Sequence, residues 1–399
     1  MSKDLHLTIV QALPVKKLPN DTVLLTRKLM EATIKFGELW PGLITVIMEE
    51  TEADSREIDP QIFKLSELPF KLEIGSFDKI NPDKLRNQTS LVLATLGYRQ
   101  NHISQVCQTA NIPCIYISEY TIKTRKQIVA VEESQPIKRL WRTRWEERQE
   151  RKQLSAIALA DGLQCNGTPT YNDYENLCSD TLLFFDTRIT KEMLVTPDEL
   201  EKRTQSLIDN KPLRLVFSGR LNKMKGADHL LDVAQELKLL KIPFELFISG
   251  RGDLEKTMHQ RISAEGLSGY VKMLGVPDFR TDFFPFVKAN IDLFICCHRQ
   301  GDPSCTYIET MSCGVPIVGY ANEAFEGIVG QSKSGWLVEM NKPKLLAQKV
   351  AELNLQRAEI KAMSNKAIEF ARKHTFEKTY DARISHMKRI AMRGSQQNK

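Results

Sequence analysis

The feature that most constrains the fold is a strand–loop–helix pattern that recurs between residues 213 and 318. Apolar runs occupy Leu213–Phe217, Phe244–Ile248 and Ile291–Cys296, and each one ends in a short loop rich in glycine or charged residues. After the first loop, apolar residues recur at helical spacing. Short apolar strands that alternate with amphipathic helices are typical of a parallel sheet with helices on both faces. The pattern therefore predicts a doubly wound α/β domain in this half of the chain.

The N-terminal half carries the same alternation of strand and helix. Apolar runs are separated by segments long enough for a helix, such as Thr22–Phe36 and His102–Asn111. At 399 residues the chain is too long for one ordinary core and suits two domains. We therefore predict an α/β fold of two Rossmann-like, doubly wound parallel-sheet domains that face each other across a cleft. The N-terminal apolar runs are Leu5–Val10, Leu43–Met48, Leu91–Leu96, Pro113–Ile117 and Gly162–Cys165.

A polar segment divides the two halves. Residues Thr187–Lys211 are rich in charge and poor in apolar side chains, which favours a hinge region. We accordingly divide the chain into an N-terminal Rossmann-like domain (1–186), the hinge (187–211), a C-terminal Rossmann-like domain (212–372) and a C-terminal helix (373–399) that returns to the N-terminal domain. Ligands of doubly wound sheets bind beyond the carboxyl ends of the strands, so the two sheets place a site in the cleft.

Two cations flank the first loop of the C-terminal half. Arg220 closely follows the apolar strand, and Lys225 stands where the next helix opens. The N-terminus of a helix attracts anions through its free N–H groups and its dipole, and arginine and lysine add positive charge there. The combination indicates a diphosphate site. Taken alone, the same segment also fits an ordinary solvated turn.

A carboxylate stands in the helix predicted after the third strand. Residues Thr306–Cys313 have a helical pattern that is stopped by Gly314 and Pro316, and Glu309 lies near its start. A carboxylate in this place can accept both hydroxyls of a ribose, while N–H groups of the preceding loop hold phosphate oxygens. The two loops together predict a nucleotide site.

Four short motifs follow one another between residues 219 and 338. They are Gly219-Arg220-Leu221 with Lys225-Gly226, Gly250-x-Gly252, Glu309-x-x-x-Cys313-Gly314-x-Pro316-Ile317-Val318, and Ser334-Gly335-Trp336-Leu337-Val338. In this order and spacing they resemble the C-terminal half of the family 4 retaining glycosyltransferases, also called glycosyl transferases group 1, which have the GT-B fold.

The resemblance implies roles for individual residues. Arg220 and Lys225 match the cations that hold the donor diphosphate, and we take them as the catalytic pair. Glu309 matches the glutamate that binds the ribose of the nucleotide. The other donor-binding candidates lie in the same two loops: Gly219, Asp302, Ser304, Cys305 and Thr306.

The sequence departs from the family pattern at two places. The family signature has two glutamates separated by seven residues, and the first of these, which contacts the transferred sugar, is replaced here by Gly301. The neighbouring Asp302 is our candidate for a substitute carboxylate. The glycine-rich loop expected after the first strand is replaced by Pro14–Asp21. Acceptor or sugar contacts are instead predicted at Glu119 and Tyr120, for which a capping or turn role is the alternative.

The segment Lys123–Lys152 concentrates positive charge. It holds ten Lys and Arg against five Glu, which gives +5 out of a net charge of +6 for the whole chain, and it contains Trp141 and Trp145 on one helical face. Basic residues with interfacial aromatics suit peripheral contact with an anionic lipid surface, or with a lipid-linked or anionic acceptor. The alternative is a solvated helix whose tryptophans pack on the domain. We expect no nucleic-acid partner, since no recognised binding motif accompanies the charge.

Cysteine and histidine usage gives no sign of a metal centre. The eight cysteines form no C-x-x-C pair, and histidines such as His229 and His298 have no partner at metal-ligand spacing. We therefore expect reduced thiols, no metal and no cofactor apart from the nucleotide-sugar substrate. The first residues lack a signal-peptide core and no apolar run approaches a membrane span, so we expect a cytoplasmic protein that is at most peripheral to the membrane.

The resemblance implies a retaining, metal-independent glycosyltransferase of hexosyltransferase type, with a role in polysaccharide biosynthesis. Such an enzyme moves a sugar from a nucleotide diphosphate sugar to a hydroxyl of a glycan, a lipid-linked acceptor or a small molecule. The alternatives are another GT-B reaction, such as nucleotide-sugar epimerisation or phosphorolysis, and a non-catalytic subunit that binds nucleotide sugar. The sequence identifies neither the base nor the sugar, the acceptor or the oligomeric state.

Overall fold

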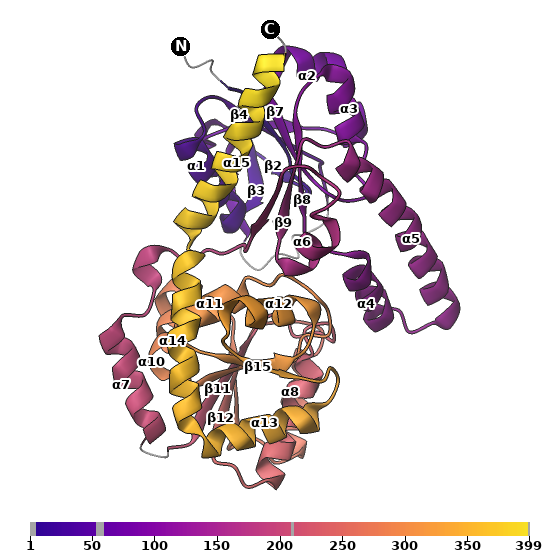
Figure 1. Cartoon of the computed structure of the whole chain (residues 1–399). Coiled ribbons are helices and arrows are strands. Elements are labelled where there is room, and N and C mark those ends of the chain that lie inside the picture. Colours follow the sequence, from indigo (N-terminus) through magenta and orange to yellow (C-terminus); the bar gives the residue numbers. More distant parts are fainter. Residues whose placement is uncertain (1–4, 53–59, 209–210, 398–399) are drawn as a thin grey trace.

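The computed structural model describes residues 5–52, 60–208 and 211–397. It has two domains, each built on a parallel sheet, with the N-terminal domain at the top of Figure 1 and the C-terminal domain below it. Residues 1–4, part of the N-terminal segment in which we expect no signal-peptide core, lie outside the described residues. The N-terminal sheet has seven parallel strands in the order β10-β9-β8-β7-β1-β4-β6. The strands are β1 (Leu7–Val10), β4 (Ile44–Met48), β6 (Lys71–Ile74), β7 (Leu91–Thr95), β8 (Cys114–Ser118), β9 (Gly162–Asn166) and β10 (Thr181–Phe184); the helices are α1 (Arg27–Leu39), α2 (Pro82–Gln88), α3 (Ile103–Ala110), α4 (Ile122–Glu132), α5 (Pro136–Ala158) and α6 (Thr168–Tyr174).

The segment Thr22–Phe36, predicted to be a helix, begins instead with a strand. Residues Thr22–Thr26 form β3, whose side chains alternate between buried and half-buried positions as its β-branched residues favour. The helix α1 starts only at Arg27, where the hydroxyl of Thr26 accepts a hydrogen bond from the Leu29 N–H (3.2 Å). Strand β3 pairs antiparallel with β2 (Lys16–Leu18) and β5 (Pro60–Lys64). This small sheet therefore includes the segment that replaces the glycine-rich loop.

The C-terminal sheet has six parallel strands in the order β13-β12-β11-β14-β15-β16. The predicted strands Leu213–Phe217, Phe244–Ile248 and Ile291–Cys296 correspond to β11, β12 and β14 of this sheet. The strand order reverses between β11 and β14, so the loops that leave these two strands diverge and open a crevice between them. The strands are β11 (Leu213–Ser218), β12 (Phe244–Ser249), β13 (Val271–Gly275), β14 (Leu293–Cys296), β15 (Ile317–Tyr320) and β16 (Trp336–Val338); the helices are α8 (Ala227–Leu239), α9 (Glu255–Ala264), α10 (Phe284–Asn290), α11 (Thr306–Ser312), α12 (Glu323–Ser332), α13 (Pro343–Leu355) and α14 (Arg357–Lys373).

The connection between the domains is shorter than its polar composition suggested. The expected hinge, 187–211, contains the short helix η3 (Lys191–Met193) and the helix α7 (Pro197–Ile208), and α7 packs against α10 and α14 of the C-terminal domain. Arg203 of α7 is buried and donates hydrogen bonds to the carbonyls of Cys313 and Gly314. Because these carbonyls satisfy the guanidinium, a charged residue can be buried in α7. The charged sequence of this packed helix therefore resembles that of a solvated linker.

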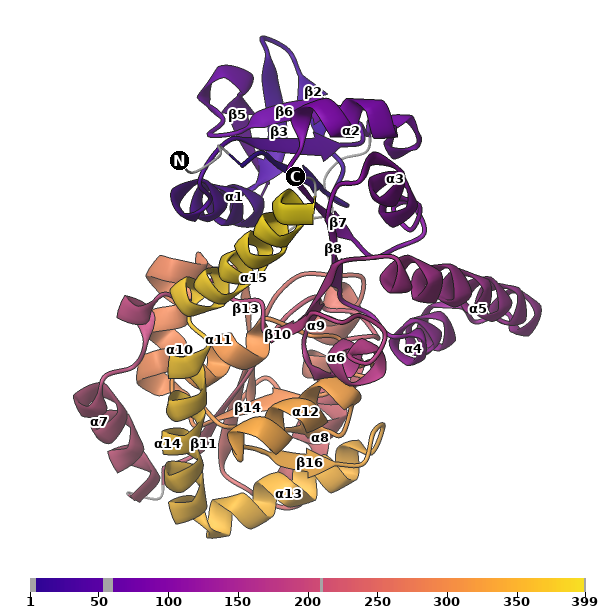
Figure 2. The same ribbon diagram turned by 45° about the horizontal axis from the view of Figure 1, so that its top comes forward.

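The last helix, α15 (Phe376–Gln397), carries the chain back to the N-terminal domain, where it packs on α1, β7 and β10 (Figure 1). At its start the N–H of Phe376 donates to the carbonyl of Ile189 (2.7 Å), so the two crossings between the domains touch each other. The view in Figure 2 shows α14 against one domain and α15 against the other. The buried apolar side chains of α15 include Tyr380, Ile384, Met387, Ile390 and Ala391, all part of the N-terminal core.

An acidic residue fixes the end of α15. Asp180 accepts ion pairs from Arg389 (2.6 Å) and Arg393 (3.0 Å), and it lies 3.3 Å from the ring nitrogen of His386. Burial works against ionisation of Asp180, but the hydrogen bond from Arg389 and the neighbouring positive charges outweigh it and lower the pKa of Asp180.

We predict that Asp180→Asn lowers the melting temperature at pH 7, by roughly 2–4 °C for each kcal/mol lost. A carboxyl group whose pKa is lowered by folding stabilises the protein above its unfolded pKa of about 4, and this contribution disappears as the pH falls through the lower folded value. The difference between wild type and variant should therefore shrink on acidification. Thermal melts from pH 7 to pH 3 measure this, and a difference that stays constant over that range contradicts the ion-pair assignment.

Candidate active-site cleft

The crevice is built by the loops that follow β11 and β14. Gly226, which caps α8, has a φ of +65°, and a Cβ at this position would lie 2.0 Å from the carbonyl oxygen of Cys297. Only glycine fits such a turn and such a contact. The N-terminus of α8 is therefore pressed against the end of β14, which brings the Arg220–Lys225 loop beside the 297–305 loop.

The two predicted cations have different surroundings. Arg220 is exposed at the loop, whereas Lys225 is half-buried and forms an ion pair with Asp302 of the other loop. Burial opposes ionisation of Asp302, but the charge of Lys225 and its hydrogen bond outweigh burial and lower the pKa of Asp302. The structure thus brings Lys225 and Asp302 together, and the carboxylate that we expected to replace the missing glutamate is paired with Lys225.

The start of α11 is held from the N-terminal domain. Lys28 of α1 donates to Cys305 Sγ (3.2 Å) and pairs with Asp186 (2.5 Å), a residue just after β10. Burial chiefly raises the pKa of the Cys305 thiol to about 12, so this cysteine is a neutral thiol at physiological pH. Ser304 donates from its hydroxyl to Thr306 (3.2 Å). The predicted loop residues Ser304, Cys305 and Thr306 therefore lie together, at the boundary of the two domains.

Glu309 lies in the first turn of α11, as the motif requires. Its side chain is 11% exposed, and its Oε1 atom accepts a hydrogen bond from Nε of Arg188 (2.8 Å). Sequence reasoning missed Lys28, Asp186 and Arg188, because each of them reaches the loop from a distant part of the chain. No local pattern in the sequence indicates them.

Glu119 and Tyr120 follow β8 on the N-terminal side and are both exposed. The capping role belongs to Thr121, whose hydroxyl accepts from the Thr124 N–H (3.1 Å) at the start of α4. Desolvation by the surrounding protein raises the pKa of Glu119 above its ordinary value, and the negative charge of Asp186 raises it further. A carboxyl group with a raised pKa that faces the cleft is a candidate for hydrogen bonding to sugar or acceptor hydroxyls.

Gly301, which stands where the family has its first glutamate, is clamped by α4 of the opposite domain. Its N–H donates to Gln127 Oε1 (2.9 Å), and its carbonyl accepts from the Thr124 hydroxyl (3.3 Å). Gln127 also donates to Glu323 of α12, and Lys123 pairs with the same carboxylate (2.5 Å). A Cβ at position 301 would lie 2.7 Å from Glu323 Oε2. The absent side chain thus leaves room for a direct contact between the domains.

The isolated histidines have structural surroundings. His298 is buried, and burial together with the charge of Lys225 holds its pKa well below the usual value. His229 bonds through Nδ1 to the Tyr320 hydroxyl (2.9 Å). Within 5–52, 60–208 and 211–397, no three His, Cys, Asp or Glu side chains are grouped so as to hold a metal ion. In the same ranges no helix has both the length and the apolar composition that a membrane span requires.

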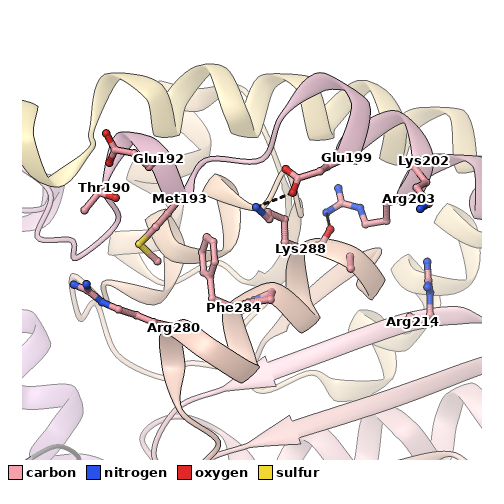
Figure 3. A pocket seen from close by; sticks show the side chains of 12 residues that line it. Thr190, Glu192, Met193, Glu199, Lys202, Arg203, Arg214, Arg280, Phe284 and Lys288 are labelled. Atoms are coloured by element: carbon pink, nitrogen blue, oxygen red, sulfur yellow. Dashed lines mark hydrogen bonds and ion pairs between the residues drawn. The ribbon is translucent and has the colours of Figure 1, made fainter.

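A cavity of about 720 Å³ lies outside the cleft, between η3, α7 and α10 (Figure 3). Its wall includes the ion pair between Lys288 and Glu199 (2.9 Å), together with Met193 and Phe284. These residues and the start of β11 line it, whereas Arg220 and Lys225 belong to loops at the opposite, carboxyl end of the strands. We therefore place the candidate active site in the cleft and not in this cavity.

The two facing Rossmann-like domains define the GT-B fold, as solved structures confirm. The structure of Anabaena HepE in complex with UDP has a TM-score of 0.64 and 16% identity, covering 96% of this chain and 98% of HepE. The structure of WaaG, a glycosyltransferase involved in lipopolysaccharide biosynthesis, has a TM-score of 0.60 and 13% identity over 96% of this chain and 99% of WaaG.

The sequence relatives agree with this class. Residues 198–374 match the model of the family Glycosyl transferases group 1. The putative colanic acid biosynthesis glycosyltransferase WcaL of Salmonella typhimurium is 27% identical over 152 residues, 36% of each chain. The D-inositol 3-phosphate glycosyltransferase of Segniliparus rotundus is 24% identical over 204 residues, 49% of this chain and 44% of that protein. These matches span less than half of each relative's length.

We predict that Gly301→Glu weakens the contact between the domains, because the new side chain meets Glu323 and brings a second negative charge beside it. Small-angle scattering should show a larger radius of gyration than for wild type. Gly330→Glu is the matched control, since a Cβ at Gly330 meets nothing within 4 Å. An unchanged radius for Gly301→Glu contradicts the clamp.

Proposed function

We propose that the protein is a retaining glycosyltransferase that moves a hexose from a nucleoside diphosphate sugar to a hydroxyl acceptor. The observation that carries this proposal is the convergence of Arg220, Lys225 and Glu309 on one switch-point crevice that faces the N-terminal domain. Two cations beside the N-terminus of a helix suit a diphosphate, and a carboxylate one loop away suits a ribose. The names of WcaL and WaaG refer to colanic acid and lipopolysaccharide biosynthesis, which supports a glycan or lipid-linked acceptor.

The chemistry proposed for the cations is stabilisation of the leaving group. As the bond between sugar and diphosphate breaks, negative charge grows on the diphosphate, and Arg220 and Lys225 offset it at a fixed place. Lys225 is kept in the crevice by Asp302 until a diphosphate arrives. The contact of α4 with Gly301 closes the crevice on one side, which favours transfer to an acceptor over hydrolysis by water.

UDP is the donor nucleotide that we propose first, because HepE and the pneumococcal O-GlcNAc transferase GtfA, with TM-scores of 0.64 and 0.54, were solved with UDP. We further propose that the reaction needs no metal, since the cations stand where a metal would neutralise the diphosphate. Activity should then persist in EDTA. Loss of activity in EDTA that Mn²⁺ or Mg²⁺ restores contradicts this assignment.

One observation favours a second candidate function. The position of the family's sugar-contacting glutamate is occupied by the clamp on Gly301, and Asp302 is bound to Lys225. A subunit that binds nucleotide sugar without turnover would have this arrangement. Binding of UDP-sugars in a thermal-shift screen, combined with no release of UDP on a broad acceptor panel, would support this candidate against the enzyme.

We predict that Arg220→Ala and Lys225→Ala each reduce transfer about 10²- to 10³-fold, because each removes a charge that stabilises the departing diphosphate. The rate of UDP release from a UDP-sugar, with and without acceptor, measures the effect. Lys223→Ala is the matched control, since this exposed lysine lies in the same loop. Melting temperatures should stay close to wild type for Arg220→Ala. Near-normal turnover in either of the two variants refutes the diphosphate assignment.

An exposed aromatic and basic face marks the segment 123–152. Helices α4 and α5 form a hairpin that projects from the side of the N-terminal domain (Figure 2). Ile137 is 73% exposed and Trp141 66% exposed, so Trp141 does not pack on the domain; Trp145 makes an edge contact with Tyr98 (5.4 Å). We propose that this face of α5 touches an anionic lipid surface, where a lipid-linked acceptor would be presented.

We predict that the protein sediments with vesicles of anionic phospholipid and that binding weakens as salt rises through about 0.15 M, where the Debye length is about 8 Å. Trp141→Ala should reduce the bound fraction, because it removes an exposed aromatic anchor. Leu239→Ala, an exposed apolar residue of α8 in the other domain, is the control. Absence of binding at low salt returns α5 to the solvated-helix interpretation.

A further inference from the structure

The connection that leaves β10 runs along the first turn of α11. Its burial alternates: Thr187 and Ile189 are buried (1% and 0% exposed), whereas Asp186 and Arg188 face the donor loop. A period of two is that of an extended chain, so residues 186 and 188 lie on one side. The hydrogen bonds of the Ile189 carbonyl with Phe376 and of the Asp186 N–H with Asn166 fix this segment on both sides of Arg188.

The spacing of this segment matches the spacing of α11. Residues two apart in an extended chain are separated by about 6.6 Å, and residues four apart in a helix by about 6 Å. Accordingly Asp186 meets Cys305, whose thiol donates to the carboxylate at 3.6 Å, and Arg188 meets Glu309 at 2.8 Å. The two contacts align the linker with α11 at two successive positions. The position of Glu309 relative to the linker is therefore determined by two contacts and not by one.

Arg188 also packs on an aromatic ring. Its guanidinium carbon lies 3.4 Å from the ring centroid of Phe279, the first residue of the π-helix η4 (Phe279–Phe283). Behind Phe279 and Glu309 there is a cavity of only about 10 Å³, bounded by Ser218 and Cys313, which is room for roughly one water molecule. Glu309 therefore cannot turn inward, and Arg188 restrains it on its outer side.

We propose that Arg188 is a positioning residue for nucleoside binding, holding the Glu309 carboxylate in the direction in which it receives the ribose hydroxyls. The guanidinium stacked on Phe279 forms a planar wall at the edge of the same site. This inference rests on the proposed function, because it assigns Glu309 to a nucleotide. It goes beyond that function in making the linker between the domains a part of donor recognition.

The alternative role for Arg188 is that of a stand-in for the ligand, a side chain that occupies part of the nucleotide site while the site is empty. A planar cation over an aromatic ring can also occupy the place of a nucleobase, in which case a nucleotide would have to displace it. The two roles have opposite consequences: removal of a positioning residue weakens nucleotide binding, whereas removal of a stand-in strengthens it. The one-sided contact through Nε and the shared register with Asp186 favour the positioning role.

The test is calorimetric titration of the full chain with UDP and with inorganic pyrophosphate. Arg188→Ala should weaken UDP binding about 10- to 100-fold, the effect of a lost hydrogen bond between charged groups, and leave pyrophosphate binding nearly unchanged. Arg188→Lys should restore part of the UDP affinity, because it keeps the charge without the planar fork. Combined with Glu309→Gln, Arg188→Ala should cause little further loss, since it acts through that carboxylate.

Lys191→Ala is the matched control, an exposed cation in the same linker. Wild-type UDP affinity in Arg188→Ala overturns the inference while leaving the proposed function intact, and so does tighter UDP binding. Equal weakening of UDP and pyrophosphate also overturns it, because a general disturbance of the site would affect both ligands. If the wild-type protein binds pyrophosphate but no UDP, the proposed UDP function and this inference fail together.

Discussion

The contact of Lys28 with Asp186 and Cys305 is the interaction on which the arrangement of the cleft depends. It joins α1 of one domain to the start of α11 in the other, through the carboxylate of the connecting segment. An ammonium that meets a carboxylate at 2.5 Å in a half-enclosed place is attracted more strongly than on an open surface. Because α11 also carries Glu309, the same contact sets where the proposed donor site stands relative to the N-terminal domain.

The second contact across the cleft explains how a departure from the family pattern fits the fold. Position 301 has no side chain, and its backbone is bonded instead to Thr124 and Gln127 of α4. A side chain at this point would have to displace the Glu323 carboxylate, which Lys123 and Gln127 hold in place. The glycine at position 301 and the approach of α4 are therefore two aspects of one local arrangement, which ties the 297–305 loop to the projecting α4–α5 hairpin.

Much of the C-terminal domain could be predicted from its sequence, because strands such as Phe244–Ile248 are short, apolar and bounded by glycine. The loop residues Arg220, Lys225 and Glu309 could be located because parallel strands bring their carboxyl ends to one edge. The sequence could not indicate Lys28 or Arg188, since their partners are more than 100 residues away. The prediction placed the start of α1 too early, at Thr22. Residues Thr22–Thr26 form a strand because they pair with β2 and β5, and no local pattern in the sequence reveals this pairing.

The chain crosses between the domains twice, and the crossings are bonded to each other where Phe376 donates to Ile189. Two connections that are bonded to each other act as a hinge between the domains. They permit rotation of one domain about the hinge and resist sliding and twisting. Opening of the cleft should thus follow one arc, in which α4 moves farther from the 297–305 loop than Lys28 does, because Asp186, the partner of Lys28, lies close in the chain to Ile189. A single connection would let the domains move in many directions, whereas this double connection returns them to the same alignment after each opening.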